Sequence, residues 1–480
     1  MDYFPAFLDL DGKPCLVVGG GEIAARKVRL LLAARARLTI VAPETCDAIT
    51  ALARDGKLEH LRKSYAPDDL NGRWLVVSAT GSEKVEAQVY ADATARRIFC
   101  NAVDRQDNCS YITPAIVDRS PVLVAISSGG AAPVLARRIR ARLEASLPAR
   151  LGVLAALARR YRQRVLDALP ALSPRIRFWE RVIDGPAGVA ALAGDVAAAE
   201  ASVESLLGEA AALAAEPGIA WLTGAGPGDP ELLTLKALQA LQSADVIVHD
   251  RLVGEEILAL ARRDAERISV GKTPGCRANS QASINELLVE LVAAGKRVCR
   301  LKGGDPFIFG RGGEEAEALA AEGLRYRVIP GITAAAGCAA AAGIPLTHRD
   351  DAQSVVLLTA HGKDSIDTLD WPSLARDRQT LAVYMGVRRF TDLMTRLIEH
   401  GRPADTPIAI VERGTIPEQR VIRGTLGQLN LLAEAHRVVA PALLLIGAVA
   451  SRGAGIGAQH VTEASAAPGG ESFAQSNRAG

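Results

Sequence analysis

CLVVGGGEIAARK at Cys15–Lys27 and WLTGAGPGDPELLTLKA at Trp221–Ala237 are glycine-rich segments in different halves of this chain. Each follows an apolar run typical of a buried strand and precedes apolar residues at helical spacing. A strand, a tight glycine turn and a helix in this order are the local structure of many α/β cofactor sites. Two different loops of this kind predict two cofactor sites, and therefore two chemistries, in one α/β polypeptide.

The chain length indicates more than one domain. A single hydrophobic core stops growing at about 250 to 300 residues, and this chain has 480. Its apolar fraction of 49% and charged fraction of 23% are ordinary for a globular protein. The formal net charge of +2 does not give the global positive field of a nucleic-acid-binding protein, so no nucleic-acid partner is expected.

The sequence carries no sign of secretion or membrane insertion. No run of about 18 uncharged apolar residues occurs, and the N-terminus MDYFPAFLDLDG has acids where a signal peptide has basic residues. We expect a cytoplasmic protein that does not interact with a membrane. The seven cysteines form no Cys-x-x-Cys pair, so we expect reduced thiols and no permanently bound metal.

The first glycine loop matches a dinucleotide fingerprint, Gly19-x-Gly21-x-x-Ala24, at the start of a predicted helix. The next predicted strand, 37–42, ends without the usual ribose-binding acid, which is displaced to Glu44. NAD is therefore the preferred cofactor, while the choice between NAD and NADP stays open. The residues expected around the nucleotide are Gly19, Gly21, Glu22, Ile23, Pro43 and Glu44.

Further apolar runs at 74–79 and 98–103 continue the alternation of strands and helices in a doubly wound sheet. Ligands bind at the carboxyl ends of such strands. Thr80, Asn101 and Asp104 are thereby expected near a bound nicotinamide. Asp104 could equally be a loop or helix-capping residue.

A predicted strand at 121–126 runs into Ser127-Ser128-Gly129-Gly130, and a helix follows near Ala132. Because helix N-termini favour anions, Ser128 could contact substrate or accept a phosphate. Residues 131–181 contain twelve arginines and three acids. This basic stretch is either a solvated helical face or a binding surface for a polyanion.

The remaining boundaries follow from composition. Residues 185–216 are alanine-rich and predict helices, and Glu216-Pro217-Gly218 marks a domain boundary. After Ser451 the sequence is small and polar, which predicts a disordered tail. We therefore expect domains at 1–113, 114–216 and 217–450, followed by a tail at 451–480.

The second glycine loop, 224–229, lacks the Gly-Lys-Ser/Thr ending of a Walker A site. A helix with Leu232, Leu235 and Leu238 on its apolar face is predicted after it. Three further apolar strands end in polar or glycine residues. Their ends are HD at His249–Asp250, GK at Gly271–Lys272 and KGGD at Lys302–Asp305.

These motifs carry a specific resemblance. GAGPGDPELLTLKA, VHDRL, VGK, RLKGGDPFIFGRGGEE, VIPGITAA and GIPLTHRD, within 218–450, are similar to the tetrapyrrole methylase family, particularly uroporphyrinogen-III C-methyltransferases. VVGGGEIAARK, IFCNAVD and SYITPAIVDRSPVLVAISSGG resemble precorrin-2 dehydrogenases that are also sirohydrochlorin ferrochelatases. Fused in this order, the two halves resemble the siroheme synthase family along almost the whole chain.

The resemblance implies an N-terminal Rossmann-type domain, a helical dimerisation and substrate region, and a C-terminal tetrapyrrole methylase domain. It implies S-adenosylmethionine-dependent double methylation of uroporphyrinogen III to precorrin-2, NAD-dependent oxidation to sirohydrochlorin, and insertion of ferrous iron as a substrate. A homodimer is also implied. Because these intermediates carry eight carboxylates, the basic stretch becomes a candidate tetrapyrrole-binding surface.

Residue roles follow from matching the family motifs. Asp250 is the expected general base and Lys272 the expected acid or charge partner in methylation, and Asp104 is expected to serve both dehydrogenation and iron insertion. The residues expected around S-adenosylmethionine are Pro227, Gly303, Gly304, Asp305, Ile308, Thr333, Ala334, Met385 and Gly414.

Three alternatives stay open. The methylase could act on a cobalamin-pathway intermediate, because such enzymes share cofactor loops and differ in substrate. The N-terminal half could be a redox-sensing or tetrapyrrole-binding module without turnover. The inserted metal could be cobalt rather than iron, because a carboxylate site discriminates weakly between them.

Overall fold

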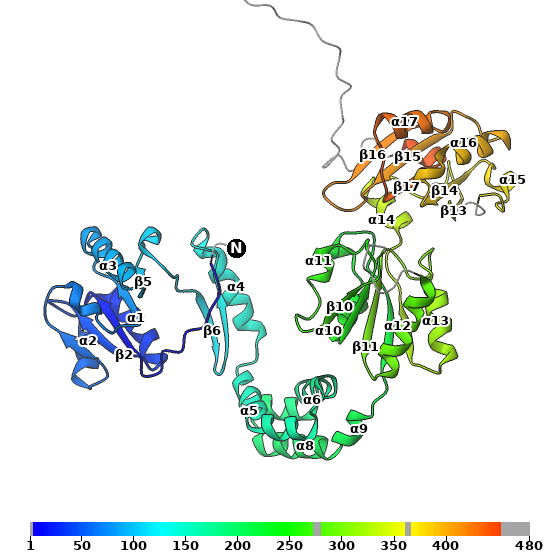
Figure 1. Cartoon of the computed structure of the whole chain (residues 1–480). Coiled ribbons are helices and arrows are strands. Elements are labelled where there is room, and N and C mark those ends of the chain that lie inside the picture. The colour runs from blue at the N-terminus through cyan, green and yellow to red at the C-terminus, as the bar shows by residue number, and fades with distance from the viewer. Residues whose placement is uncertain (1–2, 272–279, 361–365, 453–480) are drawn as a thin grey trace, which may run out of the picture. The chain divides into compact units, whose positions relative to one another are not determined.

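The structure is a computed structural model that describes residues 3–271, 280–360 and 366–452 (Figure 1). It divides into two compact units, Met1–Pro170 with Arg175–Ala210, and Ala171–Pro174 with Ala211–Gly480. Lys272 and the tail predicted to be disordered, beyond Arg452, lie outside the described residues. The finer boundaries at 113 and 216 stay predictions.

The N-terminal part of the first unit is a five-stranded parallel sheet in the order β3-β2-β1-β4-β5, drawn in blue in Figure 1. The order reverses at β1, where open α/β sheets place their ligand crevice. Its elements are β1 (Pro14–Val18), α1 (Glu22–Ala33), β2 (Arg37–Val41), α2 (Asp47–Arg54), β3 (Glu59–Leu61), η1 (Pro67–Leu70), β4 (Leu75–Ser78), α3 (Glu83–Ala95), β5 (Phe99–Ala102) and η2 (Gln106–Asn108).

Two apolar layers hold this sheet between helices. Alternate strand residues such as Val17 and Ile40 pack against α1 and α2, and the intervening residues such as Leu16 and Val41 pack against η1 and α3. A parallel sheet covered on both faces requires such nearly continuous apolar strands. The Rossmann-type fold predicted for this half is confirmed.

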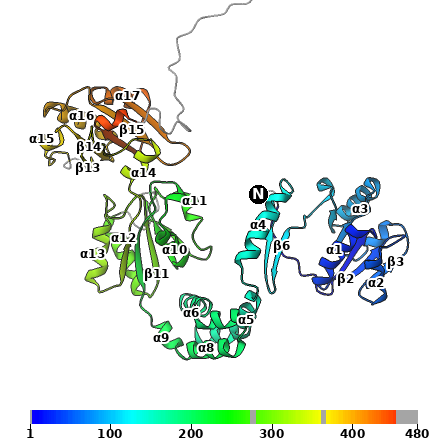
Figure 2. The same cartoon turned by 180° about the vertical axis from the view of Figure 1, so that it is seen from behind.

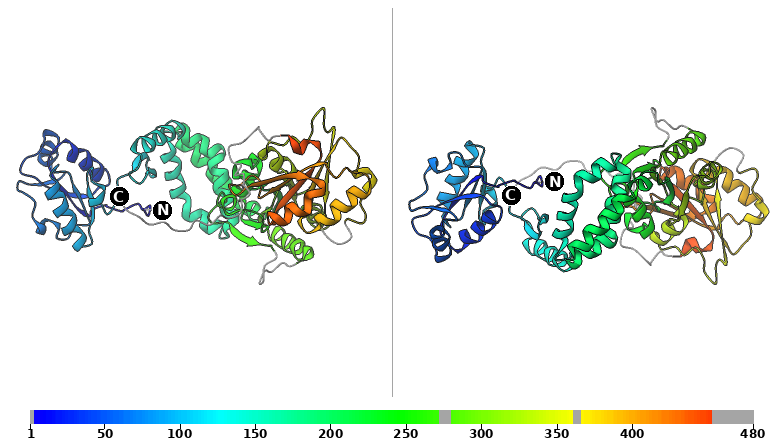
Figure 3. Two further views of the ribbon diagram at one scale, coloured as in Figure 1. Left: turned by 90° about the horizontal axis from the view of Figure 1, so that it is seen from above. Right: turned by 90° about the horizontal axis from the view of Figure 1, so that it is seen from below.

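A hairpin and a group of helices follow the parallel sheet, and all of their residues belong to the first unit except 172–174 and 211–214, which belong to the second. The elements after the parallel sheet are β6 (Ala115–Arg119), β7 (Val122–Ile126), α4 (Pro133–Ser146), α5 (Leu151–Ala168), α6 (Leu172–Asp184), α7 (Pro186–Ala193), α8 (Val196–Gly208) and α9 (Ala210–Ala214). The helix predicted near Ala132 is α4, and the segment that contains Pro148 separates it from the next helix, α5. Helices α5, α7 and α8 pack on one another, in the teal segment of Figure 3.

The second unit begins with a five-stranded parallel sheet in the order β10-β9-β11-β8-β12. Helices α10 and α11 cover one face, and α12 and α13 cover the other (Figure 2). The elements are β8 (Ile219–Gly224), η3 (Pro230–Leu232), α10 (Leu235–Ser243), β9 (Val246–His249), α11 (Glu255–Leu258), β10 (Glu266–Ser269), α12 (Gln281–Ala293), β11 (Arg297–Lys302), α13 (Gly312–Ala321), β12 (Tyr326–Ile329) and α14 (Ala334–Ala341).

A second, mixed sheet follows in the order β13-β14-β17-β15-β16, with only β13 and β14 parallel. The elements are β13 (Ser354–Thr359), α15 (Trp371–Leu374), β14 (Gln379–Tyr384), η4 (Val387–Arg389), α16 (Phe390–Glu399), β15 (Pro407–Glu412), β16 (Arg420–Thr425), η5 (Leu426–Gln428), α17 (Leu429–Ala435), β17 (Ala442–Ile446) and η6 (Ala448–Ser451). Among the residues described, no helix has both the length and the apolar character to span a membrane.

The helix predicted after the second glycine loop has a different buried face from the one expected. Thr234 caps α10 by accepting a hydrogen bond from the Ala237 amide at 3.2 Å, so the helix begins only at Leu235. Leu235 is 80% exposed, whereas Ala237 and Leu241 are buried. The prediction of an apolar face through Leu232, Leu235 and Leu238 is therefore wrong, because the cap shifts the start of the helix.

We expect Leu241→Ala to lower the free energy of unfolding of the second unit by about 2 to 5 kcal/mol, because it leaves a cavity in the core. Leu235→Ala, the matched surface control, should change it by no more than about 0.5 kcal/mol. Urea unfolding of both variants measures the difference. Equal losses would contradict this placement of α10.

Candidate active sites

The first glycine loop is held in place by backbone contacts. The Gly19 amide donates to the Val41 carbonyl at 3.0 Å, and the Gly20 carbonyl accepts from the Cys46 amide at 2.8 Å. A Cβ on Gly20 would lie 1.9 Å from the Glu44 carbonyl oxygen. The turn is thus pressed against the segment after β2, which explains a glycine at position 20 that the fingerprint alone did not single out.

The outer side of the same loop is open. A Cβ on Gly21 would meet nothing within 4 Å, and Gly21 is the N-cap of α1 without a side-chain capping bond. The first amides of α1 therefore have no side-chain partner, an arrangement that suits a pyrophosphate. Glu22, Ile23, Pro43 and Glu44 are exposed around this opening. The arrangement fits a dinucleotide.

Asp104 lies beyond the end of β5 with a positive φ of 63°, and it is exposed. Lys27 on α1 interacts electrostatically with it and donates a hydrogen bond to Thr113 at 3.2 Å. Burial lowers the pKa of Lys27, and the charges of Asp104 and Cys109 partly oppose that effect. Lys27 is thus coupled electrostatically to Asp104, and the sequence patterns did not single out Lys27.

The other two strand-end residues face inward to the protein's own backbone or side chains. Asn101 is buried and donates to the Tyr111 carbonyl at 3.0 Å. The Thr80 hydroxyl donates to buried Glu86 at 3.4 Å, and Glu86 also accepts from the Gly81 amide at 3.0 Å. The structure therefore uses the side chains of Asn101 and Thr80 to shape the loops, and it leaves Asp104 exposed at the rim.

The Ser128 hydroxyl accepts a hydrogen bond from the Ala132 amide at 3.0 Å, immediately before α4. Gln106, two residues beyond Asp104, donates to the Gly129 carbonyl at 2.8 Å. The serine loop is thereby tied to the Asp104 loop. Ser128 is half-buried, and its role toward substrate or phosphate stays a prediction.

The basic stretch separates into two groups of arginines. On α5, Arg164 bonds Glu204 of α8 at 2.8 Å, and Arg160 pairs with Glu200. Those side chains connect helices. On α4, Arg140 donates to the Ile116 carbonyl at 2.8 Å. The other three exposed arginines of this helix have no hydrogen bond or ion pair within the part of the chain that the structure describes, and they are available to an anion. They are Arg137, Arg138 and Arg142.

The second glycine loop meets two other loops with no side chain between them. Gly226 and Gly304 exchange backbone hydrogen bonds of 3.1 and 2.7 Å. A Cβ on Gly224 would lie 2.5 Å from the Gly304 carbonyl oxygen and 2.6 Å from the Gly331 Cα. The ends of β8, β11 and β12 therefore converge at one point.

Side chains strengthen this convergence. Asp305 accepts from the Phe307 amide at 2.8 Å and the Gly331 amide at 3.1 Å. Thr333 and the Tyr384 hydroxyl lie 2.5 Å apart. Asp305, which was expected to attract a cationic cofactor, thus also joins two loops through hydrogen bonds to their amides. The contact with Tyr384 was not indicated by the motifs.

The second sheet contributes the other side of the site. A Cβ on Gly337 would lie 2.5 Å from Pro227 Cγ, and the Asp229 amide donates to the Thr415 hydroxyl at 3.2 Å. Met385 follows Tyr384 with a positive φ of 53° and is 46% exposed. Of the residues predicted around S-adenosylmethionine, Pro227, Gly304, Asp305 and Thr333 take part in these loop contacts. The full predicted set stays a prediction: Pro227, Gly303, Gly304, Asp305, Ile308, Thr333, Ala334, Met385 and Gly414.

Asp250, at the end of β9, accepts a hydrogen bond of 2.6 Å from Arg300 of β11. Arg300 also donates to Glu315 of α13 at 2.9 Å, and Lys302 donates to the same Glu315 oxygen at 2.7 Å. Arg300, Lys302 and Glu315 are buried, whereas the Asp250 side chain is about one-third exposed. Lys272, the predicted partner of Asp250, lies outside the described residues.

This ionic cluster has a recognisable sequence signal. In the stretch RVCRLK, Arg300 and Lys302 share one face of a strand that is covered by helices on both sides. Buried cations require partners, so a nearby acid could have been expected. Burial and the neighbouring Arg300 charge lower the pKa of Lys302, against the opposing charges of Glu315 and Asp250.

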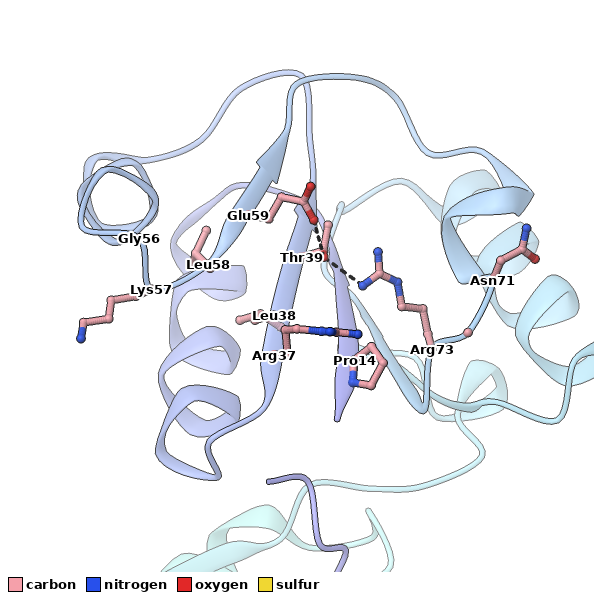
Figure 4. A pocket seen from close by; sticks show the side chains of 11 residues that line it. Pro14, Arg37, Leu38, Thr39, Gly56, Lys57, Leu58, Glu59, Asn71 and Arg73 are labelled. Carbon is pink, nitrogen blue, oxygen red and sulfur yellow. Dashed lines mark hydrogen bonds between the residues drawn. The ribbon is translucent and has the colours of Figure 1, made fainter. Parts of the chain in front are cut away.

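A hollow of about 630 Å³ lies at the amino ends of β1 and β2, at the opposite end of these strands from the first glycine loop (Figure 4). Thr39 donates to Glu59 at 3.0 Å and accepts from Arg73 at 2.9 Å across its floor. These side chains satisfy one another. The sequence patterns did not indicate a site there.

The chain matches four described families. They are "Putative NAD(P)-binding" over residues 6–115, "Sirohaem biosynthesis protein central" over 120–146, "Sirohaem synthase dimerisation region" over 150–207 and "Tetrapyrrole (Corrin/Porphyrin) Methylases" over 221–430. The chain is 54% identical over 450 residues to siroheme synthase 3 of Aeromonas hydrophila, covering 94% of this chain and 95% of the relative.

The chain belongs to the siroheme synthase family. Siroheme synthases of Pseudoalteromonas translucida and Azotobacter vinelandii are 50% and 53% identical over 94% of this chain, and the alignments cover 95% and 96% of those relatives. A solved uroporphyrin-III C-methyl transferase from Thermus thermophilus, complexed with S-adenyl homocysteine, is 40% identical with a TM-score of 0.42, and covers 49% of this chain and 94% of its own. The recognition and fold class predicted from the motifs are confirmed.

Two glycine substitutions distinguish a Cβ that would overlap the protein's own backbone from a Cβ that would obstruct only a bound ligand. Gly20→Ala should destabilise the N-terminal sheet, because its Cβ overlaps the Glu44 carbonyl. Gly21→Ala should leave folding unchanged and weaken NAD binding about tenfold or more, equivalent to about 1.4 kcal/mol. Thermal unfolding and NAD titration measure the two effects. Gly208→Ala, at an open helix end, should do neither, and unchanged NAD binding by Gly21→Ala would contradict the site.

Proposed function

We propose that this chain converts uroporphyrinogen III to siroheme in three steps at two separate sites. The observation that carries the proposal is the similarity to siroheme synthases over 94% of the chain. The same span includes a dinucleotide-type loop and a tetrapyrrole methylase region. The alternative of a cobalamin-pathway methylase has less support, because it accounts only for the second half.

Methylation takes place in the second unit. S-adenosylmethionine supplies the methyl group, whose bond to sulfur breaks as a bond to a ring carbon forms. Asp250 accepts the proton that leaves the alkylated ring, with Lys272 as its acid or charge partner, and the step occurs twice to give precorrin-2. The converging glycine loops hold the reacting groups in line. No protein nucleophile takes part.

Oxidation and metal insertion share Asp104. Bound NAD would supply the acceptor for the hydride of precorrin-2, and Asp104 would accept the accompanying proton, so that sirohydrochlorin results. Ferrous iron, the third substrate, then enters as two pyrrolic protons leave, and the same carboxylate accepts a proton. NAD rather than NADP is proposed, because the exposed Glu44 would accept a hydrogen bond from the ribose and repel a phosphate.

The substrates carry eight carboxylates, and the unpaired arginines of α4 suit them.

We also propose a homodimer, because the dimerisation region exposes large apolar side chains that a monomer would leave in water. They are Leu166, Leu172, Ile183, Val189 and Val196. The cytoplasmic location and the preference for iron over cobalt stay predictions.

Separate substitutions should uncouple the two sites. Asp104→Ala should reduce NADH formation from precorrin-2 and iron insertion by about 100-fold or more, because one carboxylate serves both steps. It should leave methylation of uroporphyrinogen III unchanged. Asp250→Asn should have the opposite pattern. Full NAD reduction by Asp104→Ala would refute the shared role.

The unsubstituted chain provides the test of turnover in the first unit. If it binds precorrin-2 and NAD without forming NADH, the N-terminal half is a binding module and the proposal fails for that half.

Dimer formation has its own test. Replacing both Val189 and Val196 with Asp should give a monomer by light scattering, because two charges would enter an apolar contact. Leu431→Asp, at a site 67% exposed in the second unit, is the control and should stay dimeric. A parent chain that is monomeric would overturn the proposed assembly.

A further inference from the structure

The buried cluster behind Asp250 has a balanced charge. It holds two cations, Arg300 and Lys302, and two carboxylates, Asp250 and Glu315. Asp250 is the member with an exposed portion, and so it is the one that a substrate can reach. A proton arriving on Asp250 would leave Glu315 as the single carboxylate beside two buried cations, and the cluster would carry a net charge of +1.

Uncompensated charge is expensive at low dielectric, because water cannot solvate it. Arg300 donates its 2.6 Å hydrogen bond to an oxygen of the Asp250 carboxylate, so the two form an ion pair only when that carboxylate carries its charge. This matters for the proposed reaction, because two methylations each deliver a proton. A base that keeps the first proton cannot take the second.

Geometry adds a second constraint. Arg300 is 1% exposed, and it reaches Asp250 through one guanidinium nitrogen at 2.6 Å and Glu315 through another at 2.9 Å. The rigid fork of a guanidinium fixes the angle between these two bonds. Lys302 and Gln281 also donate to the Glu315 oxygen, at 2.7 and 3.3 Å. Arg300 cannot turn away without breaking these bonds.

We propose that Arg300 is a positioning residue, braced by Glu315 and Lys302, that holds the Asp250 carboxylate in one orientation and returns it to the ionised form after each methylation. The inference rests on the proposed role of Asp250 as the base. It assigns to three buried residues a part in the reaction that neither motif nor family description gives them.

The other groups near Asp250 do not offset this effect among the residues described. His249 precedes it, with Nδ1 3.2 Å from the Asp250 carbonyl oxygen. Arg251 follows it and is exposed. Glu314 interacts with Lys302 but is held by Arg311 at 2.7 Å. The direct charge partner of Asp250 is Arg300.

Two substitutions in the full chain should move the pH dependence of methylation in opposite directions. Arg300→Met removes the positive charge that faces Asp250 and leaves the negative charge of Glu315. The low-pH side of the plot of kcat against pH, called the acidic limb, should therefore move to higher pH by about 1 to 3 pH units. Glu315→Gln removes a negative charge and should move the same limb downward. The measurement is kcat at saturating uroporphyrinogen III and S-adenosylmethionine, because substrate carboxylates titrate in this range and alter KM.

Controls distinguish positioning from folding. Arg300→Lys keeps the positive charge, so the acidic limb should lie at the same pH as in the parent chain. Its kcat should be lower, because one ammonium group cannot make the two hydrogen bonds of the guanidinium group in the same geometry. Arg297→Met breaks another Arg–Asp pair on β11, with Asp245 at 3.2 Å, and should leave the limb in place. S-adenosylhomocysteine binding verifies that each variant is folded. If Arg300→Met does not fold, the nearly isosteric Glu315→Gln decides alone.

The contradicting results are distinct. If Asp250→Asn is inactive but neither Arg300→Met nor Glu315→Gln moves the limb, the positioning role is wrong and the proposed base stands. If Asp250→Asn retains the parent rate, the proposed base is wrong and this inference falls with it.

Discussion

Close contact between backbone segments, with no side chain between them, is the constraint on which both candidate sites depend. At the first site the turn at Gly20 rests on the Glu44 carbonyl, and at the second Gly224 rests on Gly304 and Gly331. Each contact brings strand ends within reach of one ligand. It also leaves outward-facing glycines, such as Gly21, open on the ligand side. The packing that closes each loop from within therefore also shapes the surface offered to a cofactor.

The two candidate bases stand in different electrostatic settings. Asp104 is exposed at a loop and interacts electrostatically with Lys27. Asp250 is backed by Arg300 and a buried carboxylate. An exposed carboxylate at the rim of a site can reach a large macrocycle that is bound in more than one orientation. Two successive reactions on the same macrocycle require this. A braced carboxylate suits a single, repeated proton transfer.

Much of this could be predicted because glycine spacing and apolar periodicity are local signals. The strands at Pro14–Val18 and Arg297–Lys302 and the two cofactor loops follow from them. The start of α10 was misjudged, because the Thr234 cap outweighs the leucine spacing. Tyr384 and Glu315 were missed, because their partners, Thr333 and Arg300, are brought to them by sheet topology and not by sequence proximity. Long-range polar contacts of this kind leave little trace in one sequence.

The central claim is that one chain runs three ordered steps at two sites. A stepwise anaerobic assay tests it most directly: the purified chain is mixed with uroporphyrinogen III, and S-adenosylmethionine, NAD and ferrous iron are added in turn. The account predicts a separate spectral change after each addition, with NADH formed only after methylation and siroheme only after iron. NADH formation before S-adenosylmethionine is added, or none after complete methylation, would contradict it.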